Sequence, residues 1–375
     1  MPPEKCKVLF ILHFAPPIHG AAVVGNYIKE SAIINNNFDC TFINLSTSKY
    51  INEKGKGGFK KLFLFGRLYF KIFLSLKKNK YKICYLTINS KGAAFYKEMV
   101  VVLLFKAFNC RIVYHYHNKG ISENQNNRFL NWLYHLQFKN AKAILLSPLL
   151  YSDVSKYLSR KQIYYCPNGI PFGYTDFDSI NFRIKNNSGS SILFLSHMMK
   201  EKGVYILLKA LKILHSKQVR FTANFIGEWA DINQKDFNDF LLFNKLETNV
   251  FYLGKKYGQE KSMAFESADI FVLPTLNDCF PLVILESMQY GLPIISTSEG
   301  AIPEIIDNGI NGYIIPKNDA ITLAQKIEYL INNWSIRLQM GQKGYQRFKE
   351  KFTLPIFEDN FVQILKQIIN DFELE

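Results

Sequence analysis

Residues 268–293 read ADIFVLPTLNDCFPLVILESMQYGLP, and this stretch decides the fold of the second half of the chain. Its apolar run from Ile270 to Leu273 is short and ends at Pro274, which is typical of a buried parallel strand. After a polar loop, Pro281 is preset for the first turn of a helix that Gly291 closes. The N–H groups at such a helix start face the space beyond the strand's carboxyl end, where nucleotides bind in open α/β sheets.

Two acids frame this turn. Asp278 lies in the loop before the helix, and Glu286 lies in its middle among Val283, Ile284, Leu285 and Met288. A carboxylate in so apolar a helix needs a partner if it is buried, and a pair of ribose hydroxyls would serve. The alternative is that Glu286 lies on the solvated face of an ordinary helix, and the spacing leaves both interpretations open.

The segments DCFPL (278–282), ESM (286–288), GLP (291–293) and GAIPEII through NG (300–312) resemble the Glu-x7-Glu signature of retaining GT-B glycosyltransferases, glycosyltransferase family 4. The resemblance implies that Asp278 contacts the donor sugar and is catalytic, that Glu286 holds the nucleotide ribose, and that the loop amides from Phe280 to Leu282 hold sugar and phosphate. Asp278 is one methylene shorter than the usual Glu, and Pro281 replaces a Gly and has no N–H to donate. Both differences concern the sugar more than the nucleotide.

Length and composition indicate two domains of ordinary size and an anionic partner. The 375 residues are 48% hydrophobic and carry a formal net charge of +15. The six cysteines lie far apart without a C-x-x-C pair, which favours reduced thiols in a cytosolic protein over a zinc or disulfide framework. Residues 8–15 could form a short signal-peptide core, but the Pro-Pro and Gly that follow favour a strand-to-loop turn. No run approaches the ~20 apolar residues of a membrane span.

The first half of the chain has its own glycine turn after a predicted strand, Lys7 to Phe14. The loop PPIHGAA (16–22) opens a helix from Ala21 to Ile33, and Gly20 permits close backbone approach to a ligand. The loop resembles the family's Pro-Pro-x-x-Gly-Gly turn, with Ala21 at the second Gly. The resemblance assigns Gly20 to donor binding.

A histidine pair follows the strand predicted from Arg111 to Tyr116. Because strand side chains alternate, His115 and His117 share one face at the carboxyl end. In the family a His at such a strand end contacts the donor sugar near the reacting carbon. His117 fits that place and His115 is the fallback, while an ordinary core or surface histidine is the alternative.

The second domain begins with a strand from Ser191 to Leu195, followed by SHMMKEKG (196–203) at the start of a helix. This resembles the family's Gly-Arg-Leu…Glu-Lys-Gly, whose Arg and Lys clamp the donor diphosphate. Lys202 matches the Lys. His197 stands at the Arg position and lacks the bidentate guanidinium, so the clamp is weaker or Lys200 takes part.

The predicted organisation is α/β in the GT-B manner, two doubly wound Rossmann-like domains facing across a cleft. We expect an N-terminal acceptor domain at 1–172, a linker at 173–190, a nucleotide-sugar domain at 191–354 and a final helix at 355–375 that returns to the first domain. The linker contains Asp176-Phe177-Asp178, which in a polar segment without a preceding strand reads as a solvated loop and not as a metal site.

The resemblance implies a retaining glycosyltransferase that transfers a sugar from a nucleotide-sugar, expected to be a UDP-sugar, to a glycan or lipid-linked acceptor in bacterial cell-envelope polysaccharide biosynthesis. No cofactor, metal or nucleic acid is expected. The alternatives are a non-catalytic basic protein that binds nucleotide or anionic lipid, and a sugar-nucleotide epimerase or hydrolase on the same scaffold.

The segment 54–82 contains ten Lys or Arg and no acid. On a helix, Lys60, Arg67, Lys71 and Lys78 fall on one stripe, and Leu62, Phe65, Tyr69, Phe73 and Leu76 fall opposite. Such a helix is typical of anionic membrane surfaces, although a helix packed on a Rossmann-like sheet has the same pattern. The expected location is cytoplasmic, with peripheral attachment to the inner face of the plasma membrane through 54–82.

Overall fold

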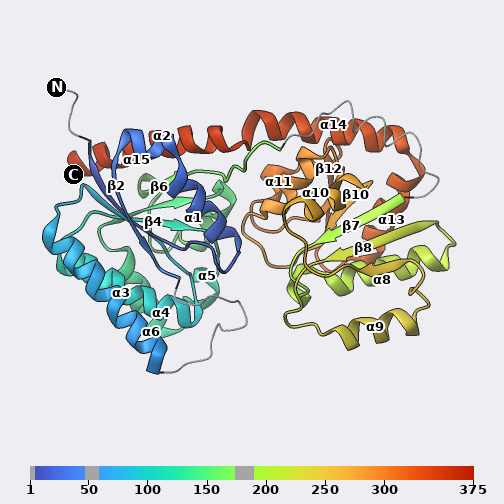
Figure 1. Cartoon of the computed structure of the whole chain (residues 1–375), viewed down its shortest axis with the longest axis horizontal. Coiled ribbons are helices and arrows are strands. Elements are labelled where there is room, and N and C mark those ends of the chain that lie inside the picture. Colours follow the sequence, from blue (N-terminus) through green and yellow to red (C-terminus); the bar gives the residue numbers. More distant parts are fainter. Residues whose placement is uncertain (1–4, 47–58, 174–189) are drawn as a thin grey trace. The chain divides into compact units, whose positions relative to one another are not determined.

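The computed structural model describes residues 5–46, 59–173 and 190–375, with the side chains of α3 described from residue 63 onward. The chain divides into two compact units (Figure 1). Unit 1 comprises Met1–Asn168 and Leu354–Glu375, and unit 2 comprises Gly169–Thr353. In the described part of the chain, no helix combines the length and apolar character needed to cross a membrane. The predicted linker, including Asp176-Phe177-Asp178, lies outside the described residues apart from its two ends.

Unit 1 is built on a parallel six-stranded sheet with the order β2-β1-β3-β4-β5-β6. Its strands are short apolar runs, most of them buried on both faces, as a parallel sheet between helices requires. The strands are β1 (Lys7–Leu12), β2 (Asp39–Asn44), β3 (Ile83–Thr87), β4 (Ile112–Tyr116), β5 (Ala141–Leu145) and β6 (Ile163–Tyr165).

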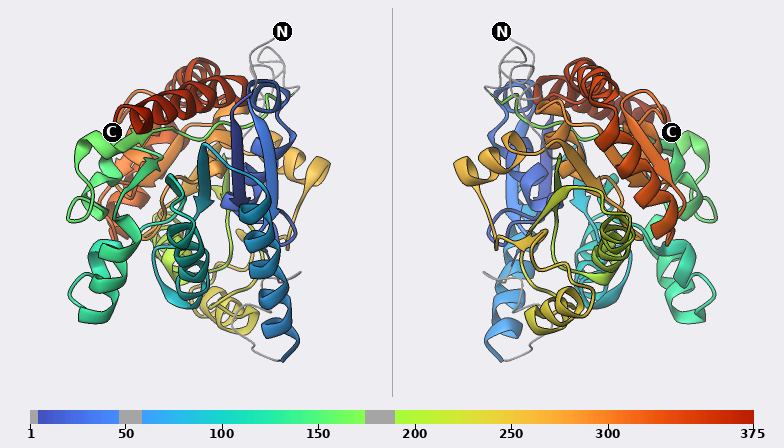
Figure 2. Two further views of the ribbon diagram at one scale, coloured as in Figure 1. Left: turned by 90° about the vertical axis from the view of Figure 1, so that its left-hand side faces the viewer. Right: turned by 90° about the vertical axis from the view of Figure 1, so that its right-hand side faces the viewer.

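Helices cover both faces of this sheet (Figures 1 and 2). On one face lie α1 (Gly20–Glu30), α2 (Ala32–Asn37) and α15 (Leu354–Glu373), and Phe361 of α15 packs against Phe10 and Tyr85. On the other lie α3 (Phe59–Lys78), α4 (Gly92–Ala107) and α6 (Arg128–Phe138). The short α5 (Ile121–Asn124), η2 (Pro148–Asp153) and η3 (Arg160–Gln162) complete the unit.

Unit 2 is also built on a parallel six-stranded sheet, with the order β12-β11-β10-β7-β8-β9. Helices α8 and α13 pack together, as do α11 and α14 (Figure 1). The strands are β7 (Ser190–Leu195), β8 (Phe221–Ile226), β9 (Val250–Tyr252), β10 (Ile270–Leu273), β11 (Ile294–Thr297) and β12 (Gly312–Ile315). The helices are η4 (Lys200–Lys202), α8 (Val204–Ser216), α9 (Gln234–Phe243), α10 (Gly258–Glu266), α11 (Leu282–Gln289), α12 (Ile302–Ile305), α13 (Ala320–Asn332) and α14 (Trp334–Lys351).

The predicted fold class, two doubly wound α/β domains, is confirmed, but three local predictions need correction and one strand was missed. The helix expected from Ala21 to Ile33 breaks at Ser31, whose hydroxyl caps α2 by accepting from Ile34 N. The sequence pattern of residues 149–158 also predicts a helix, but the structure has only the shorter 3₁₀ turn η2 there. Pro281 is the N-cap of α11 and not its first helical residue. Strand β11 was not predicted.

The apolar stripe predicted on the helix of segment 54–82 mainly faces its own domain. Leu76 is buried, the Tyr69 hydroxyl donates to Lys97 O on α4, and Phe73 packs edge-on against Phe108. Packing on the neighbouring helix therefore accounts for much of that stripe. Lys54 and Lys56 lie outside the described residues.

Candidate functional site

In unit 2 the strand order reverses between β7 and β10. From β7 the chain proceeds through β8 and β9 to one edge of the sheet, and it then returns to β10 on the other side of β7. Ligands of open α/β sheets bind beyond the carboxyl ends of the strands at such a switch point. The two loops that leave these strand ends, 196–203 and 274–281, carry most of the residues predicted to hold a donor.

Lys202 and Asp278 meet at this switch point. Lys202 Nζ lies 2.6 Å from Asp278 Oδ2 and 3.0 Å from the carbonyl oxygen of Asn277. The other carboxylate oxygen of Asp278 accepts from Cys279 N at 3.0 Å. An ammonium group has three protons and a carboxylate about four acceptor positions, so each group can add a ligand contact to this pair. The sequence placed these residues on separate parts of a donor, and the structure joins them directly.

Two glycines allow the loops to pack this closely. At Gly203, φ is +82° and an added Cβ would lie 2.1 Å from Pro274 O. At Gly300, φ is +55° and an added Cβ would lie 2.4 Å from Asp278 O. Both positions combine a left-handed backbone with contact against another backbone, which only glycine tolerates.

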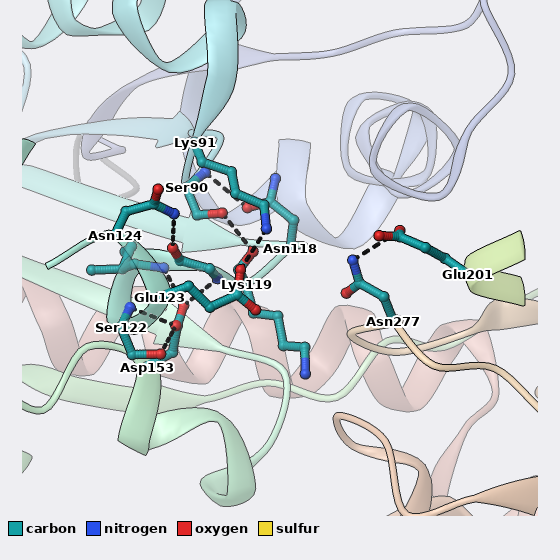
Figure 3. Close-up of polar contacts among 12 residues, drawn as sticks. Ser90, Lys91, Asn118, Lys119, Ser122, Glu123, Asn124, Asp153, Glu201 and Asn277 are labelled. Atoms are coloured by element: carbon teal, nitrogen blue, oxygen red, sulfur yellow. Dashed lines mark hydrogen bonds and ion pairs between the residues drawn. The ribbon is translucent and has the colours of Figure 1, made fainter. Parts of the chain in front are cut away.

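Hydrogen bonds from Glu201 tie the two loops together. Its carbonyl oxygen accepts from Leu276 N at 2.7 Å and from Thr275 Oγ1 at 3.2 Å. Its side chain accepts from Asn277 Nδ2 at 3.0 Å, as Figure 3 shows. These hydrogen bonds to the backbone and side chain of Glu201 therefore fix the position of Lys202, the next residue.

A second ion pair supports the Asp278 loop from behind. Glu299 is fully buried, pairs with Lys317 and lies 3.4 Å from Asp278 N through Oε1. Ala301 N also donates to Cys279 O at 2.8 Å. Buried carboxylates need such partners. This pair was not predicted from the sequence, because the two residues come from different loops.

The start of α11 lies directly after this loop. Pro281 caps the helix without a side-chain hydrogen bond, and Leu282 begins it. Phe280 is buried and its ring packs edge-on against Phe352. The partial positive charge of the helix N-terminus and the backbone at Phe280 and Leu282 thus lie beside the Lys202–Asp278 pair.

Glu286 is partly buried on α11 and has a partner that the sequence analysis missed. Lys261 Nζ, on α10, lies 2.7 Å from one carboxylate oxygen and 2.6 Å from the other. The carboxylate is therefore neither a lone buried charge nor a fully solvated one. The signal for its need of a partner was its apolar surroundings, but nothing local in the sequence identifies Lys261.

The two remaining cation candidates of unit 2 differ in exposure. His197 is partly exposed, and its carbonyl oxygen accepts from Met199 N at 2.8 Å. Lys200 is exposed, and its backbone N donates to Asp231 Oδ1 at 2.9 Å. Both belong to the loop that ends at Lys202, so they remain candidates for the same anion.

Unit 1 has its own switch point, between β1 and β3. The residues around it are His13, Asn89 and Glu98, all three missed by sequence reasoning. The carboxylate of Glu98, buried on α4, accepts from Asn89 N at 2.6 Å and Asn89 Nδ2 at 2.7 Å, and His13 Nε2 lies 3.4 Å from its Oε1. Gly20 begins α1 near this edge and is exposed, with open space where a Cβ would stand. The signal for Glu98 was a lone acid in an apolar helix, the same signal that drew attention to Glu286.

His115 and His117 lie together, with ring centroids 4.2 Å apart. His115 is completely buried and its Nδ1 shares a short hydrogen bond with the Tyr85 hydroxyl, so it is a core residue. His117 is partly exposed beyond the end of β4. Burial, reinforced by His13, lowers the pKa of His117 to about 3, and burial with the neighbouring His117 lowers the pKa of His115 well below its ordinary value. Both rings are neutral at pH 7.

The loop that carries His117 is held by a polar network within unit 1 (Figure 3). Asp153 accepts from Gly120 N, Ile121 N and Ser122 N at 2.9, 3.2 and 2.9 Å. Asn118 is joined to the loop after β3, because Ser90 N donates to its Oδ1 at 2.9 Å and its Nδ2 donates to Asn89 Oδ1 at 2.9 Å. The His117 loop and the Glu98–Asn89 cluster therefore form one connected structure.

Within residues 5–46, 59–173 and 190–375, no group of three or more His, Cys, Asp or Glu side chains is placed to hold a metal ion. The described polar groups of both switch points are satisfied mainly by ion pairs and hydrogen bonds to other protein groups.

Comparison with known proteins agrees with this geometry. Residues 177–347 match the family model described as "Glycosyl transferases group 1". The chain is 28% identical over 211 residues to the capsular polysaccharide biosynthesis glycosyltransferase CapM of Staphylococcus aureus, covering 55% of this chain and 54% of CapM. It is 30% identical over 139 residues to the amylovoran biosynthesis glycosyltransferase AmsK of Erwinia amylovora, covering 36% and 34%. The chain thus spans about half the length, or less, of the curated relatives it matches.

A solved structure extends the likeness over both units. The crystal structure of Anabaena HepE in complex with UDP-glucose matches with a TM-score of 0.73 at 17% identity, covering 96% of this chain and 99% of HepE. The fold is therefore that of GT-B glycosyltransferases, and the family match over residues 177–347 falls in unit 2. The predicted family resemblance is confirmed at this level.

Proposed function

We propose that this protein is a retaining glycosyltransferase that transfers a sugar from a UDP-sugar to a glycan or lipid-linked acceptor in the synthesis of a capsular or other cell-envelope polysaccharide. The observation that carries the proposal is the pair Lys202–Asp278 at the switch point of unit 2, beside the start of α11. The relatives CapM and AmsK, named for polysaccharide biosynthesis, and the UDP-glucose complex of HepE support the pathway and the donor.

In the proposed reaction the bond between the anomeric carbon and the diphosphate breaks, and the acceptor oxygen bonds to the same face of that carbon. The acceptor proton passes to the departing UDP. Negative charge grows on the diphosphate as the bond breaks, so a cation that becomes closer to it in the transition state accelerates the reaction. Lys202 and the N–H groups at the start of α11 supply this charge, with His197 or Lys200 as a second cation. The proposal assigns no role to a metal or cofactor.

The other donor contacts follow from the same arrangement. Glu286 would accept hydrogen bonds from the ribose hydroxyls, with Lys261 holding its carboxylate before the donor arrives. Asp278, Phe280 and Leu282 would contact the sugar and phosphates, and Gly20 would allow a close approach of the backbone in unit 1. These roles come from the match to the family signature and from the position of each residue at a strand end or helix start.

Unit 1 would supply an uncharged contact to the donor sugar. Because His117 is uncharged at pH 7, it would hydrogen bond a sugar hydroxyl near the reacting carbon instead of attracting phosphate. His13 and Asn89, both in contact with Glu98, offer further polar groups at the same strand ends for an acceptor hydroxyl.

A thermal-shift panel of UDP, GDP, ADP and CMP on the full chain tests the donor assignment. A ligand at 100 times its dissociation constant stabilises the folded state by about 2.7 kcal/mol, so UDP should raise the melting temperature more than the other three. A larger shift with GDP or ADP would change the nucleotide, and no shift with any of them would contradict the proposal. Analysis of the products of UDP-glucose with and without added glycan would separate transfer from hydrolysis or epimerisation.

A further inference from the structure

Three neighbouring helices of unit 1 expose large apolar side chains that the fold does not bury. Phe63 and Phe70 on α3 are 67% and 62% exposed. On α4, Tyr96 and Leu103 are 45% and 48% exposed, and on α6, Phe129 and Trp132 are 57% and 58% exposed. We call these six residues the aromatic face. Two of its members, Phe63 and Phe70, are not in the apolar stripe predicted from the sequence.

The three helices that carry the aromatic face lie next to one another, and the exposed rings of α4 and α6 are in contact. The Tyr69 hydroxyl and the Lys97 ammonium, which lies 4.7 Å from the Phe65 ring centroid, join α3 to α4. Tyr96 stacks on Phe129 with ring centroids 6.4 Å apart, and Phe129 stacks on Trp132 at 6.1 Å. Figures 1 and 2 show the three helices side by side on the face of the sheet opposite α15.

The charge around the aromatic face is almost entirely positive. Helix α3 carries six Lys or Arg, α4 carries two and α6 carries one, and the only acid in the three helices is Glu98, which is buried. At about 100° per residue, Arg67 and Lys71 lie beside Phe63 and Phe70 on the exposed side of α3. Arg67 and Lys71 are both exposed.

We propose that the aromatic face docks on an anionic phospholipid surface. Exposed apolar patches in soluble proteins mark interaction sites, and aromatic rings bordered by Lys and Arg suit the boundary between lipid headgroups and acyl chains. A surface that lacks exposed acids over three helices meets negative charge without repulsion, which favours anionic lipid over an average protein partner. The proposal does not depend on the proposed transfer reaction.

Co-sedimentation of the full chain with phosphatidylcholine vesicles, with and without phosphatidylglycerol, tests the proposal. Binding should require phosphatidylglycerol and weaken as salt is raised. The double change Arg67→Gln and Lys71→Gln should weaken partitioning about thirty-fold, the equivalent of about 1 kcal/mol for each charge. The matched control, Lys209→Gln with Lys212→Gln on the exposed side of α8, removes the same charge from unit 2 and should change nothing.

A second pair of variants tests the aromatic rings. Phe63→Ser with Phe70→Ser should weaken vesicle binding by at least about tenfold, because each ring gains a partly apolar environment. Leu242→Ser with Phe243→Ser on α9 removes side chains that are 62% and 84% exposed and should have no effect. UDP-induced thermal shifts, measured on all four double variants, should match the unchanged chain, which separates this surface from the donor site.

The emission of Trp132 gives a direct readout, because the chain has three tryptophans. In a chain carrying Trp229→Phe and Trp334→Phe, phosphatidylglycerol vesicles should shift the emission to shorter wavelength, and lipids brominated on their acyl chains should quench it. Equal binding to both vesicle types, an unshifted Trp132, or equal losses in the control variants would overturn the proposal. Self-association that Phe63→Ser with Phe70→Ser abolishes, without vesicle binding, would assign the face to a second copy of the chain instead.

Discussion

Both units are doubly wound parallel sheets of six strands, but their strand orders differ and so do the residues at their switch points. Where the strand order reverses in unit 1, between β1 and β3, the polar groups are His13, Asn89 and the buried Glu98. Where it reverses in unit 2, between β7 and β10, a partly buried ion pair joins Lys202 to Asp278. A polar cluster without a cation at a helix start suits sugar hydroxyls, whereas a cation at a helix start suits a diphosphate. In the proposed reaction, a few loop residues would therefore give the two sheets different tasks.

Lys202→Ala should have the largest effect. It removes the charge that faces the leaving diphosphate and leaves Asp278 without its partner at 2.6 Å. Loss of one such transition-state contact typically costs two to three orders of magnitude in turnover, and UDP binding should weaken as well. Steady-state release of UDP from the UDP-sugar and calorimetry with UDP measure the two effects.

Lys200→Ala is the matched control for that variant, since Lys200 is exposed two residues earlier in the same loop. It should cost less than tenfold if Lys202 is the main cation, on the scale of an exposed ion pair. An equal loss in both variants would mean that the loop as a whole, and not Lys202, meets the diphosphate.

Glu286→Ala should weaken UDP binding by roughly 1.5–3 kcal/mol, the range for hydrogen bonds to a charged group. It also frees Lys261, which is partly exposed and can turn to water, so the fold should remain intact. Glu260→Ala removes an acid of the neighbouring helix that pairs with Lys256 and should leave UDP affinity unchanged. A folded Glu286→Ala variant with normal affinity would show that the ribose lies elsewhere.

Gly203→Ala should reduce both stability and UDP binding. Its φ of +82° is unfavourable for alanine, and the added methyl would lie 2.1 Å from Pro274 O, which must then move along with the Asp278 loop. Gly258→Ala shares the left-handed backbone, at φ +51°, but has open space around it. We expect about 1–2 kcal/mol of destabilisation at Gly258 from the backbone alone, and more at Gly203. Urea unfolding of the two variants gives the difference, and equal losses would contradict the close packing.

The pH dependence of unit 1 concerns the stability of the fold and not donor binding. Because burial lowers the pKa of His117 and His115 in the folded chain, the unfolded chain binds more protons below about pH 6.5. The stabilisation that these neutral rings contribute should therefore be complete above that pH. It should decline as the pH falls, down to about pH 3 for His117. The slope is at most about 1.4 kcal/mol per pH unit for each histidine. His117→Asn should flatten the decline seen by urea unfolding, and an unchanged slope would exclude this ring as a contributor.

The elements around the donor site were predictable because their signals are local. The apolar run Ile270–Leu273 is the observed strand β10, residue for residue, and the helix predicted from Val204 is α8. The link between Lys202 and Asp278 could not be predicted, because it depends on β7 and β10 being neighbours although far apart in sequence. The same reason hides Lys261 from Glu286 and His13 from Glu98.

The helix α3 shows a different limit of sequence reasoning. A basic amphipathic helix was predicted within the acid-free segment 54–82, and the structure has α3 there at Phe59–Lys78. The buried apolar residues could not be identified from the sequence, because the helix has two apolar sides. One side packs against α4, and the other, around Phe63 and Phe70, is exposed. Periodicity shows which side chains share one side of a helix. The neighbouring helices decide which side is buried and which remains exposed.

In the proposed reaction, unit 2 holds the nucleotide diphosphate and unit 1 contacts sugar hydroxyls. Titration of UDP into two full-length variants in a calorimeter separates these two roles. Lys202→Ala should bind UDP at least about tenfold more weakly than the unchanged chain, the loss of one charged hydrogen bond. His117→Ala should bind UDP with unchanged affinity while its turnover falls, because its contact is to a sugar that UDP lacks. Normal UDP affinity in Lys202→Ala together with lost affinity in His117→Ala would contradict the account.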